Sequence, residues 1–312
     1  MRKTVKHIII TSVTVLLLFA CGQAKENNDS GEEGPLQVVT SFTILQDIAR
    51  QIGGDDVEVH NLVSTGTDPH EFEPRPEDMR KTTDADILFY NGLNLEGGST
   101  GWFFRMISSV GQKEENVYSL TERIQPMYLK GTDGKDEEIN PHAFINPDSG
   151  IIMAKDMLDA FIEKDPKRKE SYEERAAIYI KRLKDIDKKY REKINDIPAE
   201  RRILVTSERA FQYMAHNYGL KEGFIWTIDT EENGSPEQIR SLIRFVKENK
   251  VPVLFIESNV DRRPMMTVSA ETGVPCSKKP IYSDEIGSPG DEVDTYIKFL
   301  TYNIELIHDE LK

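Results

Sequence analysis

A single histidine of this chain stands in a loop that is both acidic and rich in proline. Residues 65–76 read TGTDPHEFEPRP, with His70 near the centre. Proline restricts its own backbone and that of the preceding residue, so Pro69 limits the positions open to the imidazole. Imidazole nitrogen is a frequent metal ligand, and a ligand held in place before binding loses less entropy on metal capture. His70 is therefore a candidate metal ligand, provided that other suitable groups meet it.

Three other side chains of metal-binding type lie where the chain leaves a predicted strand or enters a predicted helix. His142 lies in INPHAFINP, Glu208 directly follows the apolar run RILVTS, and Asp284 directly follows PIYS. Ligands of open parallel sheets gather beyond the carboxyl ends of the strands. The four residues therefore predict a mixed site of imidazoles and carboxylates. Copper(I) and iron–sulfur chemistry is disfavoured, because it prefers thiolates.

Each of these residues alone has a simpler explanation. A loop histidine is commonly solvated, Glu208 is placed to cap the helix that follows it, and Asp284 is a common type of turn residue. Only the combination of four supports a metal site. No ligand role is assigned to the remaining histidines, which lie in the leader, within a predicted strand or on helical faces: His7, His60, His216 and His308.

The elements that must position these residues are short strands alternating with helices. Apolar, β-branched runs occur at residues 36–42, 57–63, 85–93 and 117–120, and again at 202–207, 224–228, 253–257 and 280–283. Helical patterns occupy residues 44–52, 101–110, 209–218 and 235–249, the last with Ser235 as its N-cap. This alternation predicts an α/β fold of βαβ units with mainly parallel sheets.

A different kind of segment joins the two series of strands. Residues 169–197 contain no glycine or proline and carry apolar residues at helical spacing, with Pro166 before them and Pro198 after them. About 28 helical residues would span roughly 42 Å, the length of a whole lobe. A coiled coil is the alternative, but the apolar stripe is short for one. We therefore expect a rigid linking helix at 167–198 between an N-terminal lobe at 36–166 and a C-terminal lobe at 199–312.

The first residues predict export. Three basic residues precede the uncharged apolar run 8–20, which is shorter than the roughly 20 residues of a membrane span and fits a secretory signal peptide at 1–20. Cys21 follows, in a sequence that resembles the lipobox of bacterial lipoproteins, although Phe19 departs from the smaller residue common there. This resemblance implies a diacylglycerol thioether on Cys21. Cleavage without lipid attachment and an uncleaved anchor are the alternatives. Residues 21–35 are polar and predict a flexible tether.

Composition narrows the class of partner. The net charge is −14, which disfavours nucleic acid as a partner, while 38% hydrophobic residues suit a folded domain with a solvated surface. Cys276 is the one other cysteine, so no disulfide is expected. Its simplest role is that of a small buried apolar residue. A thiolate metal ligand is the alternative.

Several of these segments together resemble the metal-binding lipoprotein family of ABC transporters, the cluster A-I solute-binding proteins of manganese type. The matching segments are TDPHEFEPRPEDMRKTTDADILFYNGLNLE, NPHAFINPDSGI, ILVTSERAFQYMA and IYSDEIG, and the likeness spans about 36–312. It implies two lobes, each with a mainly parallel four-stranded sheet flanked by helices, joined by one long backbone helix. It also implies a metal in the cleft between the lobes, bound by His70, His142, Glu208 and Asp284.

The resemblance favours Mn²⁺ as the metal. Zinc-type relatives usually have histidine where this chain has Glu208, and they often carry a histidine-rich loop where residues 131–139 read GTDGKDEEI. Many relatives have Asp and Trp in place of Asn140 and Phe144, which are neighbours of a ligand and bear on its tuning. Zn²⁺ and Fe²⁺ remain the alternatives, because zinc outcompetes manganese at a generic site of nitrogen and oxygen ligands.

The implied function is that of an extracytoplasmic, lipid-anchored, monomeric substrate-binding protein. It would capture a divalent metal ion and deliver it to an ABC permease in the cytoplasmic membrane. A surface adhesin, a role attributed to some relatives, is an alternative of another class. A metal-dependent hydrolase is disfavoured because the chain has neither HExxH nor GxSxG. We therefore expect no enzymatic activity.

Replacement of Cys21 tests the lipid anchor. Because the thiol is the predicted attachment point, Cys21→Ser should abolish lipid attachment and release the mature protein from the membrane. Detergent phase partitioning of wild type and variant measures this. A variant that stays in the detergent phase would contradict the lipoprotein interpretation.

Overall fold

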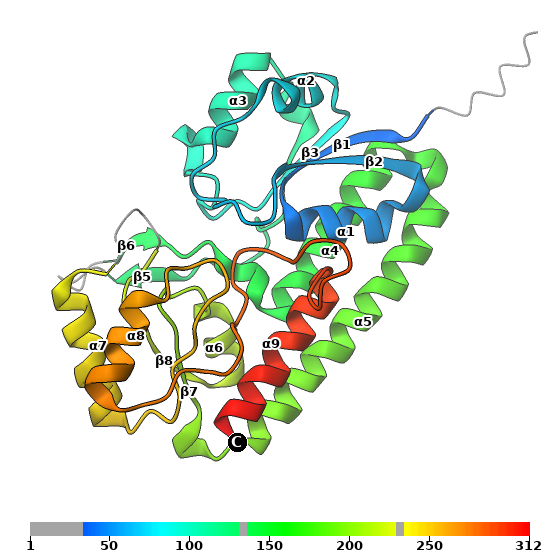
Figure 1. The fold of residues 1–312 in the computed structure, drawn as a ribbon. Coiled ribbons are helices and arrows are strands. Elements are labelled where there is room, and N and C mark those ends of the chain that lie inside the picture. Colours follow the sequence, from blue (N-terminus) through cyan, green and yellow to red (C-terminus); the bar gives the residue numbers. More distant parts are fainter. Residues whose placement is uncertain (1–33, 131–135, 229–233) are drawn as a thin grey trace, which may run out of the picture. The chain divides into compact units, whose positions relative to one another are not determined.

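The computed structural model describes residues 34–130, 136–228 and 234–312, and its fold is built from parallel strands and the helices packed on them (Figure 1). In these residues no helix combines the length and the apolar character that a membrane crossing requires. The predicted signal peptide and most of the predicted tether, with Cys21, lie outside the described residues.

The first sheet has four parallel strands in the order β2-β1-β3-β4. Parallel neighbours need crossover connections, and a helix supplies each of them. The strands and helices in chain order are β1 (Leu36–Phe42), α1 (Thr43–Gly53), β2 (Val57–Val63), α2 (Pro76–Asp84), β3 (Ile87–Tyr90), α3 (Trp102–Val110) and β4 (Val117–Ser119). The four-stranded sheet predicted for this lobe is confirmed.

The second sheet is regular over two parallel strands only, β7 (Ile203–Val205) and β8 (Lys221–Gly223). The predicted strands at 253–257 and 280–283 are not regular strands in the structure. Isolated parallel bridges pair this part of the chain instead, Leu254 with Cys276 and Glu257 with Ile281. Phe255 N donates to Val205 O at 2.8 Å and so places the third segment beside β7. The arrangement repeats that of the first lobe, with shorter runs of regular pairing.

Two predicted elements are shifted along the chain. Strand β8 ends at Gly223, whereas the prediction covered 224–228, and helix α6 (Gln212–Tyr218) begins three residues later than expected. The late start of α6 has a visible cause: Arg209 N donates to Trp226 O at 3.1 Å and Glu208 bridges Trp226, so the backbone at 208–209 is paired with another segment and is not helical. Two helices complete this lobe, α7 (Pro236–Asn249), with the predicted Ser235 cap, and α8 (Arg263–Thr272).

The predicted linking helix is α5 (Lys169–Asp196), which runs beside α4 (Pro147–Lys164) and α9 (Tyr296–Leu311) (Figure 1). Tyr190 Oη on its buried face donates to Leu300 O at 2.8 Å. Buried residues recur every three or four positions along α5, as an amphipathic helix requires. Its buried residues are Tyr172, Ala176, Tyr179, Leu183, Ile186, Tyr190 and Ile194.

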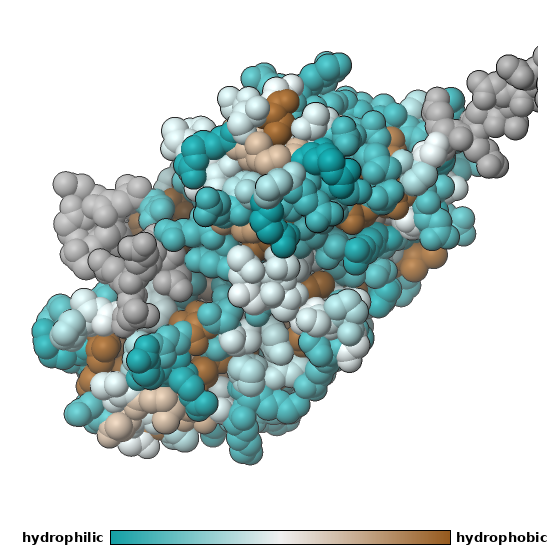
Figure 2. Space-filling model, turned by 45° about the horizontal axis from the view of Figure 1, so that its top comes forward, coloured by the Kyte–Doolittle hydropathy of each residue, from teal (hydrophilic) through white to brown (hydrophobic). Residues whose placement is uncertain are grey.

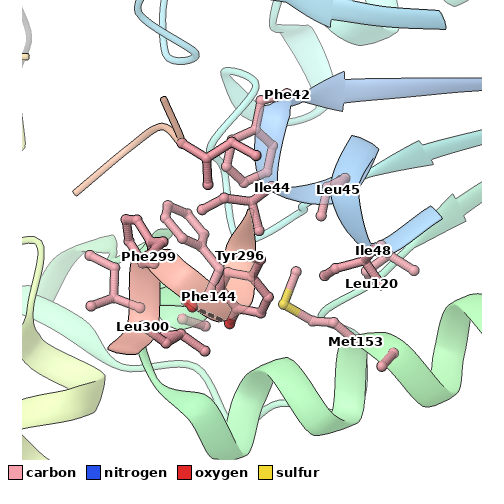
Figure 3. Packing of buried hydrophobic residues seen from close by; sticks show 14 of the residues in the cluster. Phe42, Ile44, Leu45, Ile48, Leu120, Phe144, Met153, Tyr296, Phe299 and Leu300 are labelled. Atoms are coloured by element: carbon pink, nitrogen blue, oxygen red, sulfur yellow. Dashed lines mark hydrogen bonds between the residues drawn. The ribbon is translucent and has the colours of Figure 1, made fainter. Parts of the chain in front are cut away.

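One apolar cluster extends across both series of strands. Figure 3 shows Phe42 and Ile44 of the first lobe close to Phe144 and to Tyr296 of the last helix. The Tyr296 hydroxyl donates to the Phe144 carbonyl, and Tyr296 N donates to Asp47 Oδ2 at 2.9 Å. The start of α9 therefore packs against the first lobe, and Phe144 lies within a continuous apolar core.

The surface agrees with the acidic, polar composition. In the view of Figure 2 it is mostly hydrophilic, and hydrophobic residues lie in small separate groups.

A short antiparallel hairpin, β5 (Tyr128–Lys130) and β6 (Asp136–Ile139), was not predicted. It leads into the 3-10 helix η4 (His142–Ile145), which contains one of the candidate ligands.

Candidate metal centre

Three of the four predicted ligands form one group: one ligand atom from each of His70, His142 and Glu208 lies within 4.8 Å of the other two. The fourth, Asp284, is not part of that group and reaches the site through His142. Asp284 Oδ1 lies 3.1 Å, and Glu208 Oε1 3.6 Å, from His142 Nε2. Each ligand comes from a different loop. These loops follow β2, β6, β7 and the segment bridged at Ile281, so the site joins residues far apart in sequence.

The converging atoms are shielded from water and poorly paired. His142, Glu208 and Asp284 are buried, and His70 is partly exposed. Three atoms, His70 Nε2, His142 Nε2 and Asp284 Oδ1, are buried without a hydrogen-bonding partner in the described part of the chain. Such atoms are rare because each lacks the partner that water would give it. Two nitrogens and carboxylate oxygens around one point fit a divalent cation, which would satisfy all of them.

Asn140 fixes the orientation of the His142 ring. The Asn140 amide nitrogen donates to Arg209 O at 2.9 Å and to Gln212 Oε1 at 3.0 Å, so its oxygen faces His142. That oxygen accepts from His142 Nδ1 at 2.8 Å. The proton of a neutral ring therefore sits on Nδ1, and Nε2 presents its lone pair to the site.

The His70 loop is held through its backbone. Trp102 Nε1 donates to Pro69 O at 3.0 Å, and the Asp68 carboxylate accepts from His70 N at 2.7 Å. The indole packs edge-on against Phe72, with ring centroids 5.0 Å apart. The indole and the aspartate thus add to the restriction by Pro69, and His70 is positioned before any metal arrives.

Glu257 holds the backbone that carries Glu208. Its buried carboxylate accepts from Ser207 N and Glu208 N, both at 2.9 Å. Burial raises the pKa of Glu257 to about 7, against the lowering effect of these backbone hydrogen bonds. Glu257 was not identified from the sequence, although an acid at the end of the apolar run VLFIE is a signal of a functional strand end.

Glu96 has a corresponding place in the first lobe. Its buried carboxylate accepts from Asn91 N and from Ser41 Oγ, both at 2.7 Å. Asn91 in turn donates from its side chain to Pro141 O at 3.0 Å, next to His142. Burial raises the pKa of Glu96 to about 7. Nothing in the local sequence pattern marks Glu96, because its partners lie in other loops.

The electrostatics keep two of the ligands in their metal-binding forms. Burial and the nearby His142 lower the pKa of His70 to about 4, so that its ring is neutral at pH 7. Burial opposes ionisation of Asp284, but His142, His70 and a hydrogen bond from Ser283 outweigh it and hold the pKa of Asp284 well below its usual range. The pocket therefore offers a neutral imidazole and a carboxylate at neutral pH.

Acid should destabilise the metal-free protein through His70. The unfolded ring binds a proton below about pH 6.5, while the folded ring stays neutral down to about pH 4. Stability should therefore fall as the pH drops through this window, by up to about 1.4 kcal/mol per pH unit for this group. His70→Gln should remove this part of the slope. Urea unfolding of both chelator-treated proteins from pH 7.5 to 4.5 measures it, and equal slopes would contradict the account.

Comparison with known proteins agrees with this site and fold. The family model described as "Zinc-uptake complex component A periplasmic" matches residues 38–310. The metal ABC transporter substrate-binding lipoprotein SsaB of Streptococcus sanguinis is 41% identical over 310 residues, which cover 99% of each chain. The manganese ABC transporter substrate-binding lipoprotein PsaA of Streptococcus pneumoniae is 40% identical with the same coverage.

Solved structures give the same picture. A Mn-bound periplasmic metal-binding protein of Candidatus Liberibacter asiaticus has a TM-score of 0.79 at 27% identity, over 88% of this chain and 99% of its own. The periplasmic zinc-binding protein TroA of Treponema pallidum has a TM-score of 0.80 at 26% identity, over 89% and 99%. These likenesses confirm the two-lobe fold predicted from the sequence and the resemblance to metal-binding lipoproteins of ABC transporters. The chain belongs to the family of the periplasmic component A of zinc-uptake complexes.

Proposed function

We propose that this protein captures a divalent metal ion with His70, His142, Glu208 and Asp284 and delivers it to an ABC permease for uptake. The observation that carries the proposal is that three buried atoms of ligand type, His70 Nε2, His142 Nε2 and Asp284 Oδ1, have no hydrogen-bonding partner among the described residues. A cation at that point would replace the missing hydrogen bonds and balance the carboxylates. The metal is the cargo of the protein and takes part in no reaction there.

The proposed cargo is Mn²⁺. Relatives named as manganese transporter lipoproteins align with nearly the whole chain, and Glu208 supplies an anionic oxygen, the ligand type that manganese favours. A zinc-binding protein and a cadmium-bound structure also resemble this chain. Zn²⁺ and Fe²⁺ are therefore the competing cargoes that a binding experiment must include.

The proposed setting is the outer face of the cytoplasmic membrane. The relatives that cover 99% of this chain are named as lipoproteins of ABC transporters, which supports export and a lipid on Cys21. The proposed divisions are a lobe at 36–166, the linking helix at 167–198 and a lobe at 199–312, acting as a monomer. The relatives are named as substrate-binding proteins, and we propose no catalytic activity for this chain.

Replacement of each proposed ligand tests the site. His70→Ala, His142→Ala, Glu208→Ala and Asp284→Ala should each weaken metal binding at least about tenfold, the factor that corresponds to 1.4 kcal/mol. Calorimetric titration with Mn²⁺ and with Zn²⁺ measures this. His216→Ala is the matched control, because His216 is an exposed histidine on α6. Near-normal affinity in any of the four variants would remove that residue from the site.

The third ligand should set part of the metal preference. Histidine at position 208 would supply one nitrogen in place of carboxylate oxygen and would remove a negative charge. Zinc accepts four-coordinate, nitrogen-rich sites, whereas manganese prefers more oxygen ligands. Glu208→His should therefore reduce Mn²⁺ affinity more than Zn²⁺ affinity in competition titrations. A ratio that stays constant or moves toward manganese would show that the shape of the site, and not this ligand, sets the preference.

A further inference from the structure

The two carboxylate oxygens of Asp284 have different surroundings. Oδ1 faces the metal centre, lies 3.1 Å from His142 Nε2 and has no hydrogen-bonding partner among the described residues. Oδ2, in contrast, accepts two hydrogen bonds. Asn259 Nδ2 donates to it at 2.9 Å, and Ser283 Oγ donates to it at 2.7 Å.

Chemistry fixes the direction of these hydrogen bonds. An ionised carboxylate only accepts, so the NH₂ group of the Asn259 amide must face Asp284. The Asn259 oxygen then lies 3.0 Å from Ser283 Oγ. The hydroxyl has one proton, and the shorter contact with the charged oxygen holds it, because hydrogen bonds to ionised acceptors are the stronger ones. Oδ2 is therefore engaged by two donors at once.

We propose that Asn259 and Ser283 restrict Asp284 to a single-oxygen metal ligand and thereby help to set the preference among divalent metals. This inference rests on the proposed function. The two donors fill the roughly two lone-pair sites of Oδ2, so for both oxygens to bind one ion Oδ2 would have to give up at least one donor. With that oxygen held back, the protein offers two imidazole nitrogens, one oxygen of Asp284 and the carboxylate of Glu208.

The restriction affects metals unequally. Zinc is satisfied by four ligands in a tetrahedron, so it needs no second oxygen from Asp284. Manganese prefers six ligands that are rich in oxygen, so it loses a donor that the carboxylate would otherwise supply. Asn259 and Ser283 therefore weaken the hold on manganese relative to zinc. A cargo that must later leave for the permease gains from a looser hold.

The location of Asn259 makes the inference testable without disturbing the core. Asn259 is exposed, in the loop between the extended segment 253–257 and α8, and its amide reaches inward to a carboxylate that is 4% exposed. Ser283 is buried, and its change to alanine removes only the hydroxyl. Ser258 is an exposed neighbour whose side chain makes no hydrogen bond within the described part of the chain, and Ser258→Ala is the matched control.

The experiment compares Mn²⁺ and Zn²⁺ affinities by competition titration in wild type, Asn259→Ala, Ser283→Ala, the double variant and the control. Release of Oδ2 should raise the ratio of Mn²⁺ to Zn²⁺ affinity by about tenfold in the double variant and less in each single variant, with no change in the control. Infrared difference spectra of the manganese-loaded proteins give a second readout. The separation between the two carboxylate stretching bands should narrow where both Asp284 oxygens bind.

The outcomes separate this inference from the proposed function. Wild type that binds neither metal would overturn both. Wild type that binds, together with variants whose affinity ratio and infrared bands are unchanged, would overturn the restriction of Asp284 alone. Equal weakening of both metals would also overturn it, because Asn259 and Ser283 would then position the ligand without selecting the metal. If Ser283→Ala does not fold, Asn259→Ala at its exposed position still decides the question.

Discussion

The structure must offset the free-energy cost of buried ligand atoms that have no hydrogen bond to protein and no access to water. His70 Nε2, His142 Nε2 and Asp284 Oδ1 are buried without hydrogen-bonding partners among the described residues. Each such atom costs stability in the metal-free protein. The surrounding contacts must therefore hold the loops against rearrangements that would pair these atoms with one another or expose them. Asp68, Glu96, Trp102 and Glu257 serve this purpose through hydrogen bonds with backbone atoms.

The support comes from both lobes and crosses between them. Glu96 and Glu257 fix loops at the ends of the two sheets. The segment after Asp284 is attached to the first lobe, since Ile286 N donates to Thr43 Oγ1 at 3.2 Å and Thr65 Oγ1 donates to Ile286 O at 3.0 Å. Thr65 belongs to the loop that also carries His70. A metal that draws His70 and Asp284 together therefore acts on two segments that already contact each other, which favours a small adjustment over a wide hinge motion.

The sequence was sufficient to predict the alternating strands and helices and the candidate ligands that follow strands. The apolar runs predict where parallel strands end, so the sequence pattern places His70 beyond a strand of the first lobe and Glu208 and Asp284 beyond strands of the second. The uninterrupted helical pattern at 169–197 predicts α5, which ends at Asp196. Helix α6 begins later than predicted, because the bridge between Glu208 and Trp226 overrides local preference, and β8 lies a few residues before the predicted strand. Asn259 was not identified, since its partner Asp284 lies 25 residues away and no local pattern encodes such a pair. Glu257 was missed although it ends an apolar run, because its role depends on Glu208, 49 residues away.

The central claim is that one metal ion occupies the point where the four side chains converge. Anomalous X-ray diffraction from crystals of the protein loaded with Mn²⁺ tests it most directly. The account predicts one strong anomalous peak within bonding distance of His70 Nε2, His142 Nε2, Glu208 and Asp284 Oδ1. A peak that lies elsewhere, or a centre from which one of these side chains points away, would contradict it.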